Sequence, residues 1–235
     1  MTEARARILA LDTATEACSA AVLAGERIAS RYAELDRGHS ELILGMVDAV
    51  LAEARLALRD LDAVAFGCGP GAFTGARLAA SIAQGLAFAT GLPVVPVSDL
   101  RALAQRGLDL APGVRSVLVC ADARMQEVYW ACFRRDARGL AEPYEEGERV
   151  SAPQAVDLPR SLESPVQGAG RGFIARPELA ARLGSRLAAI RGDLLPRAEE
   201  VARLAAADLA GGRSVAPEQA APVYLRNDVA RPPRL

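Results

Sequence analysis

The most constraining feature of the chain is a glycine-rich run, Gly67-Cys68-Gly69-Pro70-Gly71-Ala72-Phe73-Thr74-Gly75. Four glycines and one proline in nine residues predict a tight turn in which the backbone approaches another group closely. A strand-like segment precedes the run, and a helix of mainly small residues follows it. Thr74 is placed to cap that helix, whose first N–H groups would be free. Such a loop is typical of anion-binding sites and suggests a nucleotide enzyme.

The composition argues against several classes of protein. The 235 residues include no lysine, and the net charge is −1, so there is no Walker A loop and no global field that attracts nucleic acid. No apolar run approaches the roughly 20 residues of a membrane span, and the charged start does not match a signal peptide. The cysteines occur singly in or beside apolar segments: Cys18, Cys68, Cys120 and Cys132. This pattern is typical of free thiols in a reducing compartment, so we expect a cytoplasmic protein.

Hydrophobic periodicity predicts an α/β architecture with two lobes. Strands are expected at 8–12, 18–23, 27–33, 63–67, 94–97, 115–121 and 127–133, and helices at 40–57, 75–90, 98–105 and 197–210. Beyond residue 137, prolines cut the chain into short pieces. We therefore predict an N-terminal lobe at 1–106, a smaller C-terminal lobe at 107–227 and a disordered tail at 228–235.

Several motifs together resemble one family. They are Ile8-Leu9-Ala10-Leu11-Asp12-Thr13-Ala14-Thr15, His39-Ser40, Gly69-Pro70-Gly71-Ala72-Phe73-Thr74-Gly75-Ala76-Arg77, Asp122-Ala123-Arg124-Met125-Gln126-Glu127-Val128-Tyr129 and Pro222-Val223-Tyr224-Leu225-Arg226. The chain resembles the TsaB family, also called YeaZ, over residues 8–227. The resemblance implies the actin/Hsp70-like fold (ASKHA, ribonuclease H-like), two-lobed with a shortened second lobe. It also implies a non-catalytic relative of TsaD, the partner that carries a metal and the threonylcarbamoyl transfer site.

The resemblance places a degenerate phosphate loop after the first strand. The complete form of that loop has glycine where Ala14 stands, and the Cβ of alanine hinders a close approach of phosphate. Side chains of this loop are then expected to hydrogen-bond within their own turn. The glycine loop either shapes a surface beside a nucleotide or partner, or is a tight strand-to-helix connection. The predicted nucleotide-proximal residues are Asp12, Thr13, Gly69, Gly71 and Thr74.

A metal site is not expected. Relatives that resemble TsaD hold their metal with two histidines four residues apart, after the strand that matches 94–97. Here the matching residues are Asp99 and Leu103, and the single histidine is His39. Leucine is no ligand, and one carboxylate alone does not hold a metal. We therefore predict no metal site and no catalytic residue, and metalloprotease chemistry is disfavoured because it needs a histidine pair.

Two long helices are predicted to bind a partner. The helix at 75–90 is apolar on nearly every side, and the helix at 40–57 has a broad apolar face. Either their own sheet covers them fully, or they pair with helices of a second subunit, which the resemblance favours. The predicted interface residues are His39, Leu42, Ile43, Met46, Val50, Leu78, Ala79, Ile82, Ala83 and Leu86.

These inferences predict a non-catalytic scaffold. Such a subunit would bind and stabilise a TsaD-like catalytic subunit in the complex that makes N6-threonylcarbamoyladenosine at position 37 of ANN-decoding tRNAs. A TsaE-like ATPase would be another partner, tRNA would be contacted only through the complex, and the chain alone would form a homodimer. No cofactor is expected on the isolated chain, although ATP or ADP can occupy the partner interface. The alternative is a free-standing actin-fold ATPase or small-molecule kinase, with Gly168-Ala169-Gly170 as a candidate remnant of its adenosine loop.

Overall fold

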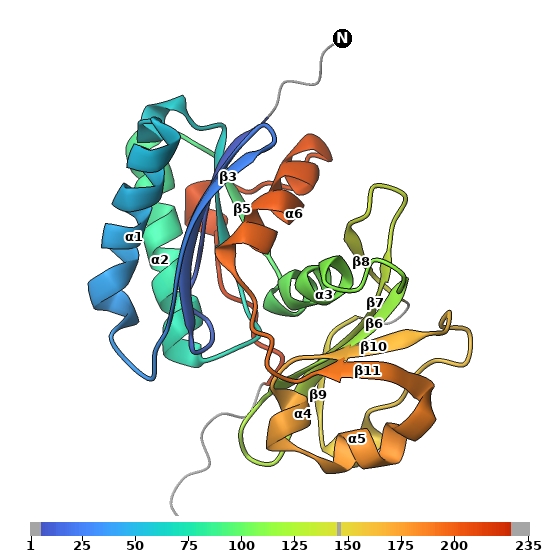
Figure 1. Ribbon diagram of the computed structural model, residues 1–235. Helices are drawn as coiled ribbons and strands as arrows, with labels where there is room; N and C mark the ends of the chain where they lie inside the picture. Colours follow the sequence, from blue (N-terminus) through green and yellow to red (C-terminus); the bar gives the residue numbers. More distant parts are fainter. Residues whose placement is uncertain (1–5, 145–146, 227–235) are drawn as a thin grey trace, which may run out of the picture.

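Two sheets of matching topology form the cores of two lobes (Figure 1). The computed structural model describes residues 6–144 and 147–226, so the predicted tail at 228–235 lies outside the described residues. The first sheet has the order β3-β2-β1-β4-β5, and the second has the order β11-β10-β6-β7-β8 with β9 paired to β7. In each sheet three consecutive strands form an antiparallel meander, and two later strands extend the sheet in parallel from its first strand.

The predicted strands and long helices are confirmed, with ends shifted by a few residues. The first sheet contains β1 (Arg7–Asp12), β2 (Ala17–Ala24), β3 (Arg27–Glu34), β4 (Ala63–Gly67) and β5 (Val94–Val97). The second contains β6 (Ser116–Asp122), β7 (Val128–Arg135), β8 (Ala141–Pro143), β9 (Arg149–Ser151), β10 (Val166–Ala169) and β11 (Leu187–Arg191). The helices are α1 (His39–Ala54), α2 (Phe73–Thr90), α3 (Asp99–Asp109), α4 (Gly172–Ala175), α5 (Glu178–Leu183) and α6 (Ala198–Ala210). Short 3-10 turns are η1 (Leu58–Asp60), η2 (Pro153–Ala155), η3 (Gly184–Arg186) and η4 (Pro217–Gln219).

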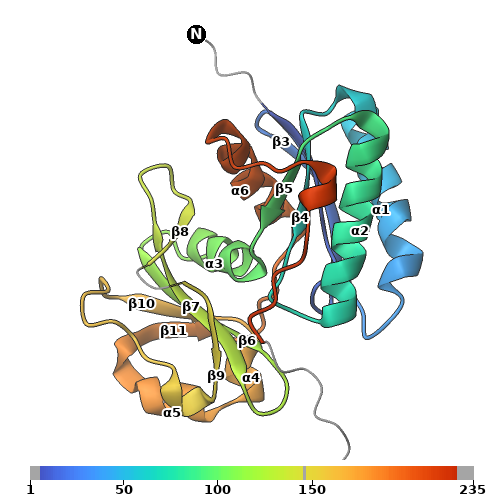
Figure 2. The ribbon, with the colours of Figure 1, turned by 180° about the vertical axis from the view of Figure 1, so that it is seen from behind.

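Helices cover both faces of the first sheet. Successive side chains of a strand point to opposite faces, so Leu9 and Leu11 of β1 pack with residues of α1 and α2, while Ile8 and Ala10 pack with residues of α6. Figures 1 and 2 show α1 and α2 together on one side and α6 on the other, with α3 next to the second sheet. Burial on both faces explains why β2 and β4 are almost entirely apolar rather than alternating, whereas the edge strand β3 is mostly polar.

The second lobe is the shorter of the two. Its helices α4 and α5 have four and six residues, compared with 16 and 18 residues for α1 and α2. One face of the second sheet packs with Phe173, Leu179 and Leu183, and the opposite face packs with α3. The α/β, two-lobed fold class with a shortened second lobe is therefore confirmed.

The chain divides between the lobes differently from the expected boundaries. Residues 106 and 107 lie inside α3, which continues to Asp109. The segment from α6 onward returns to the first lobe, where Val215 pairs with Val94 and Val223 N donates to Cys68 O at 2.7 Å. Hydrophobic periodicity shows that a helix such as α6 is buried, but it does not identify the sheet that covers it. The second lobe is thus an insertion between α3 and α6.

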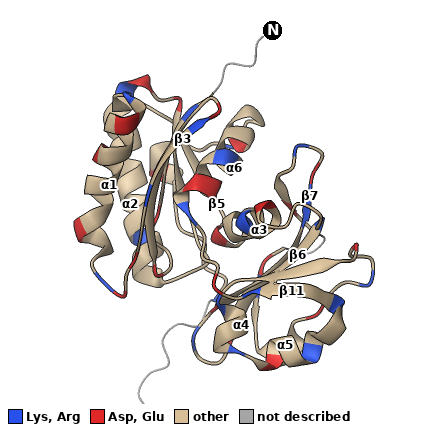
Figure 3. Ribbon diagram, viewed as in Figure 1, with Lys and Arg blue, Asp and Glu red and all other residues tan. Residues whose placement is uncertain are grey.

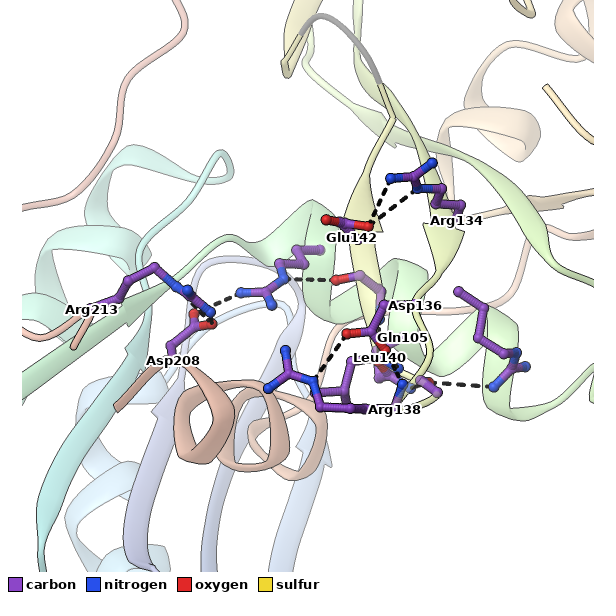
Figure 4. A network of polar contacts seen from close by, with 12 residues as sticks. Gln105, Arg134, Asp136, Arg138, Leu140, Glu142, Asp208 and Arg213 are labelled. Atoms are coloured by element: carbon purple, nitrogen blue, oxygen red, sulfur yellow. Dashed lines mark hydrogen bonds and ion pairs between the residues drawn. The ribbon is translucent and has the colours of Figure 1, made fainter. Parts of the chain in front are cut away.

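A polar network links α3 with both lobes (Figure 4). Arg101 of α3 contacts Asp208 of α6 with 2.6 Å between Nη1 and Oδ2, and its Nε donates to Ala141 O of β8 at 2.9 Å. Gln105 Oε1 accepts from Ala141 N at 2.7 Å. α3 therefore connects the first lobe with the second.

Two general predictions can be compared with the structure. All four cysteines are free and buried, as expected from their positions in apolar segments. Within residues 6–144 and 147–226, no helix is both long enough and apolar enough to cross a bilayer.

Candidate functional site

The first candidate nucleotide loop follows β1. Asp12 Oδ1 accepts a hydrogen bond from Ala14 N at 2.9 Å, so the expected bond within the turn is present. Thr13 behaves differently from the prediction, since its hydroxyl donates to Gly75 O at 2.7 Å. The first loop is therefore tied to the glycine loop instead of being open toward an anion.

The glycine loop packs directly on the first loop. A Cβ atom added to Gly71 would lie 2.3 Å from Ala14 O, and one added to Gly75 would lie 2.0 Å from Thr13 O. Ala72 N donates to Ala14 O at 2.6 Å. Glycine is needed because two backbones touch, and the N–H of Ala72 already has an acceptor. This packing favours the interpretation of the loop as a tight connection.

Thr74 does not have its predicted role. α2 begins at Phe73 with Ala72 at its N-cap, and no side chain caps the helix. The prediction that Thr74 caps α2 is wrong, because the helix starts earlier and places Thr74 inside its first turn. Gly69, also predicted in this set, has a φ of 99°, which favours glycine.

Asp12 and Asp99 form a buried pair of carboxyl groups. Asp12 ends β1 and Asp99 begins α3, so the two flank Gly67 at the end of β4. A Cβ on Gly67 would lie 2.6 Å from Asp99 Oδ1 and 2.9 Å from Asp12 Oδ1. Burial raises the pKa of Asp12, and burial together with the charge of Asp12 raises the pKa of Asp99 well above its usual range. The sequence analysis considered Asp99 only because it stands where a metal-binding histidine would be needed. Nothing in the sequence indicated that Asp99 lies beside Asp12.

A cavity of about 480 Å³ lies between the lobes beside these loops. Its lining includes Thr15 and His39 from the first lobe and Tyr129 and Arg171 from the second. His39 opens α1, as predicted, and its Nε2 donates to Thr15 O at 2.9 Å. His39 therefore lies in the wall of the cavity, at the start of α1.

Ion pairs connect the two lobes at this cavity. Arg171, which precedes α4, pairs with Glu34 at the end of β3 and lies 3.8 Å from Glu16 Oε2. Arg124 Nη2 lies 3.6 Å from Glu16 Oε1. Sequence reasoning missed Arg171 and Glu34 because residues 137 positions apart share no periodic signal.

The turn between β6 and β7 has an unusual backbone. Arg124, Met125 and Gln126 have φ angles of 60°, 48° and 62°, a region that residues with side chains rarely adopt. Glu127, which follows them, forms an ion pair with Arg226 of the C-terminal segment. The turn within the motif at 122–129 is therefore in contact with both Glu16 of the first lobe and the C-terminal segment.

The candidate adenosine-loop remnant ends β10. Gly170 has a φ of 105°, and a Cβ there would lie 2.4 Å from Cys120 O. A Cβ on Gly168 would lie 3.0 Å from the ring of Phe173. These glycines allow β10 and α4 to pack closely, which is a sufficient structural reason for their presence.

The outer surfaces of α1 and α2 correct part of the interface prediction. Ile43, Val50, Ala79 and Ala83 are fully buried in the core of the chain, so their side chains are not available to a partner. Met46, Leu78, Ile82 and Leu86 are half-buried against the same core. The predicted residue Leu42 is exposed, and so are three apolar residues that the prediction left out: Leu44, Phe73 and Phe88. The prediction included these four buried residues because the sequence shows the apolar residues of each helix but not which of them face the sheet.

No metal-binding cluster of three His, Cys, Asp or Glu side chains occurs in the described part of the chain. Asp99 and Leu103, which the sequence analysis compared with the histidine pair of TsaD-like proteins, are both buried.

Two lobes of matching strand order, with candidate nucleotide loops between them, define a protein of the actin/Hsp70-like class. The profile of TsaD, tRNA N6-adenosine threonylcarbamoyltransferase, matches residues 28–219. The tRNA threonylcarbamoyladenosine biosynthesis protein TsaB of Escherichia coli K12 is 42% identical over 226 residues, which cover 95% of this chain and 96% of that protein. Its Haemophilus influenzae counterpart is 38% identical and covers 94% of each chain. The solved structure of YeaZ from Pseudomonas aeruginosa is 43% identical, with a TM-score of 0.86 over 94% of this chain and 100% of that one.

The chain belongs to the TsaB (YeaZ) family. Membership of this family supports a role in tRNA threonylcarbamoyladenosine biosynthesis.

Proposed function

We propose that the chain is a scaffold without catalytic activity of its own, which binds a TsaD-like catalytic subunit through the outer surface of α1 and α2. The activity then belongs to the complex, which makes N6-threonylcarbamoyladenosine at position 37 of ANN-decoding tRNAs. A TsaE-like ATPase joins that complex, and tRNA is contacted only there. The names of the relatives and the match to the TsaD profile support the pathway.

One observation carries the proposed docking surface. Gly45 and Gly85 are exposed in the middle of α1 and α2, and nothing lies within 4 Å of the place where a Cβ would stand. Glycine inside a helix costs about 0.5–1 kcal/mol relative to alanine. No contact within the described chain uses the missing side chains. The absence of side chains at these two glycines would let a helix of another subunit pack closely, because small residues allow two helix axes to approach each other.

The low charge of α2 and the exposed apolar side chains of both helices support the same surface. α2 has Arg77 as its single charged residue, and its ribbon is almost entirely tan in Figure 3. Leu42 and Leu44 of α1 are 42% and 51% exposed, and Phe88 of α2 is 79% exposed. An interface of ordinary size buries about 800 Å² on each partner, which two adjacent helices can supply. In the absence of a partner, the same surface pairs with itself in a two-fold homodimer.

The loops beside the cavity between the lobes do not favour nucleotide binding by the isolated chain. Phosphate binding by the first loop is obstructed, since Ala14 and the glycine loop occupy each other's free backbone groups. We therefore expect no nucleotide on the isolated chain and ATP or ADP at the partner interface.

Light scattering after size-exclusion chromatography tests the docking surface. The purified chain should be a homodimer and should convert to a heterodimer with its cognate TsaD-like subunit. Leu42→Glu should prevent both assemblies, because it places a charge on the surface that becomes buried. Leu110→Glu is the matched control, since Leu110 is 48% exposed but follows α3. Heterodimer formation by the Leu42→Glu variant would refute the assigned surface.

ATP hydrolysis by the isolated chain tests the alternative function. The scaffold proposal predicts no hydrolysis above a buffer control. Hydrolysis that disappears in Asp12→Ala would instead favour a free-standing ATPase or small-molecule kinase, because Asp12 lies at the position of the phosphate loop.

A further inference from the structure

The pair Asp12 and Asp99 has an unusual set of partners. One oxygen of each carboxyl accepts from a backbone N–H: Asp12 Oδ1 from Ala14 N at 2.9 Å, and Asp99 Oδ2 from Gly69 N. The other two oxygens, Asp12 Oδ2 and Asp99 Oδ1, are buried and have no hydrogen-bond partner among the described residues. The two carboxyl groups flank the same glycine, since a Cβ on Gly67 would lie 2.6 Å from Asp99 Oδ1 and 2.9 Å from Asp12 Oδ1. Asp12 is 0% and Asp99 is 2% exposed.

Within the described parts of the chain, the pair has no ion-pair partner. None of the ion pairs among the described residues includes either carboxyl. The titratable groups that face it are His39 of α1, Cys18 of β2, Cys68 after β4 and Glu148 before β9. Glu148 is itself an acid and is hydrogen-bonded by the Ser98 hydroxyl, and both cysteines are buried. Only His39 can bring a positive charge, and its ring is bound to Thr15 O.

Two neighbouring buried carboxylates cannot both be ionised at low cost, because each loses its hydration and they repel each other. A single proton reduces both the loss of hydration and the repulsion. The protonated acid can donate a hydrogen bond to the carboxylate, and the pair then carries one negative charge in place of two. Glycine at position 67 makes the contact sterically accessible, since a Cβ there would overlap both acids.

The pair is positioned to control the two loops. Asp12 holds the first loop through Ala14, and Asp99 holds the glycine loop both through Gly69 N and by donating its own N–H to Gly69 O at 2.9 Å. The glycine loop leads directly into α2. A change at the pair therefore acts on the junction of the two loops, on the cavity they line and on the start of α2.

We propose that Asp12 and Asp99 share one proton, and that this proton is a pH-sensitive lock which holds the glycine loop on the first loop. With the proton in place the two loops are packed. Loss of the proton puts two adjacent negative charges in the core and separates the loops. This lock is independent of the proposed docking function, and its test uses no partner protein.

The sign of the pH effect follows from linkage. A carboxyl whose pKa is raised in the folded chain binds its proton more tightly there than in the unfolded chain, so its contribution to stability is greatest at low pH and is lost as pH rises through the folded pKa. Each pH unit in that window changes the unfolding equilibrium constant by up to about tenfold for one proton. In Asp99→Asn the amide donates to Asp12 without needing a proton, and its oxygen still accepts from Gly69 N.

Urea unfolding of the wild-type chain and of Asp99→Asn across about pH 5 to 9 tests the lock. The unfolding constant of the wild type should rise relative to that of Asp99→Asn by at least about tenfold over this range. Asp48→Asn, an exposed substitution on α1, is the control and should follow the wild type. Parallel pH profiles for the wild type and Asp99→Asn would overturn the proposal, since a merely structural role of Asp99 changes stability without changing its pH dependence.

A second measurement covers the case in which Asp99→Asn does not fold. Carbon-13 NMR of aspartate-labelled wild-type chain reports the protonation of each carboxyl directly. One carboxyl resonance of the pair should remain protonated at about pH 7, and amide exchange at Gly69 should accelerate when it titrates. Two fully ionised carboxyls at about pH 7 would refute the shared proton.

Discussion

The two faces of the first sheet are covered in different ways. On one face, α6 lies against the sheet and also contacts α3. Two acidic side chains of α6, Asp208 and Glu200, form ion pairs with Arg101 and Arg106 of α3. On the other face, α1 and α2 bury one side against the sheet, and their opposite side exposes Leu42, Leu44 and Phe88. The α6 face is completed by the chain itself, whereas the face of α1 and α2 is not. The difference separates residues that hold the fold from residues available to another subunit.

The largest effect is expected from a charge on the buried side of α2. Ala83→Glu should destabilise the chain by about 3 kcal/mol or more, because Ala83 is 0% exposed and the carboxylate would have no partner. Ser81→Glu, on the exposed side of the same helix, should change stability by no more than about 0.5 kcal/mol. Thermal unfolding of both variants checks the division between the two sides of α2. Equal melting temperatures of the two variants would contradict the division of α2 into a buried and an exposed side.

A smaller effect is expected on the α6 face. Asp208→Ala should cost about 2–3 kcal/mol, because it leaves the guanidinium of Arg101 mostly buried without its carboxylate. The exposed pair of Arg134 and Glu142, also drawn in Figure 4, is the control. Glu142→Ala should cost less than about 1 kcal/mol. Urea unfolding measures both, and similar losses would contradict a special role for the contact between α3 and α6.

The α6 face should also depend on pH. Burial raises the pKa of Glu200 to about 7, and it outweighs the attraction of Arg106 and Arg203. Because the folded pKa is the higher one, the contribution of Glu200 to stability falls as pH rises from about 4.5 to about 7 and is constant above that. Relative to Glu200→Gln, the wild type should lose about 2 kcal/mol of unfolding free energy between about pH 5 and pH 8. Denaturant titrations at the two pH values check this, and a constant difference would argue against it.

The smallest change in stability should come from the exposed glycines, and it should have the opposite sign. Gly85→Ala should stabilise the isolated chain by about 0.5–1 kcal/mol, because alanine is the better helix former. The same methyl group should weaken binding to the TsaD-like subunit, since it lies where a second helix approaches. Gly113→Ala adds a methyl in an open loop and should leave binding unchanged. Calorimetric titration with the partner measures the effect. Unaltered affinity of Gly85→Ala would show that this side of α2 is not in the interface.

Much of the first lobe could be predicted from the sequence because its signals are local. The meander, the short strand at 63–67 and the helices at 40–57 and 75–90 follow from periodicity and turn residues. The return of α6 to the first sheet could not be predicted in this way, because it depends on contacts between distant parts of the chain. The same limit applies to Arg171 with Glu34, and to Asp12 with Asp99.

The candidate site was predictable in position but not in geometry. The sequence identified Asp12, Thr13 and the glycine loop as one region. It did not show that Gly71 and Gly75 touch the first loop. A glycine that allows phosphate to approach the backbone cannot be distinguished in the sequence from a glycine that allows two backbones to pack. It also assigned Ile43 and Ala83 to an interface, because an apolar residue on a broad apolar face gives no indication of whether it faces the sheet or the solvent.

The insertion of the second lobe between α3 and α6 has a consequence for synthesis on the ribosome. Residues 6–97 contain every strand of the first sheet, but α6, which covers one face of that sheet, emerges about one hundred residues later. At about 5–20 residues per second, that face stays open to water for several seconds while the second lobe is made. The nascent chain therefore carries an apolar sheet surface that a chaperone can bind before the fold closes.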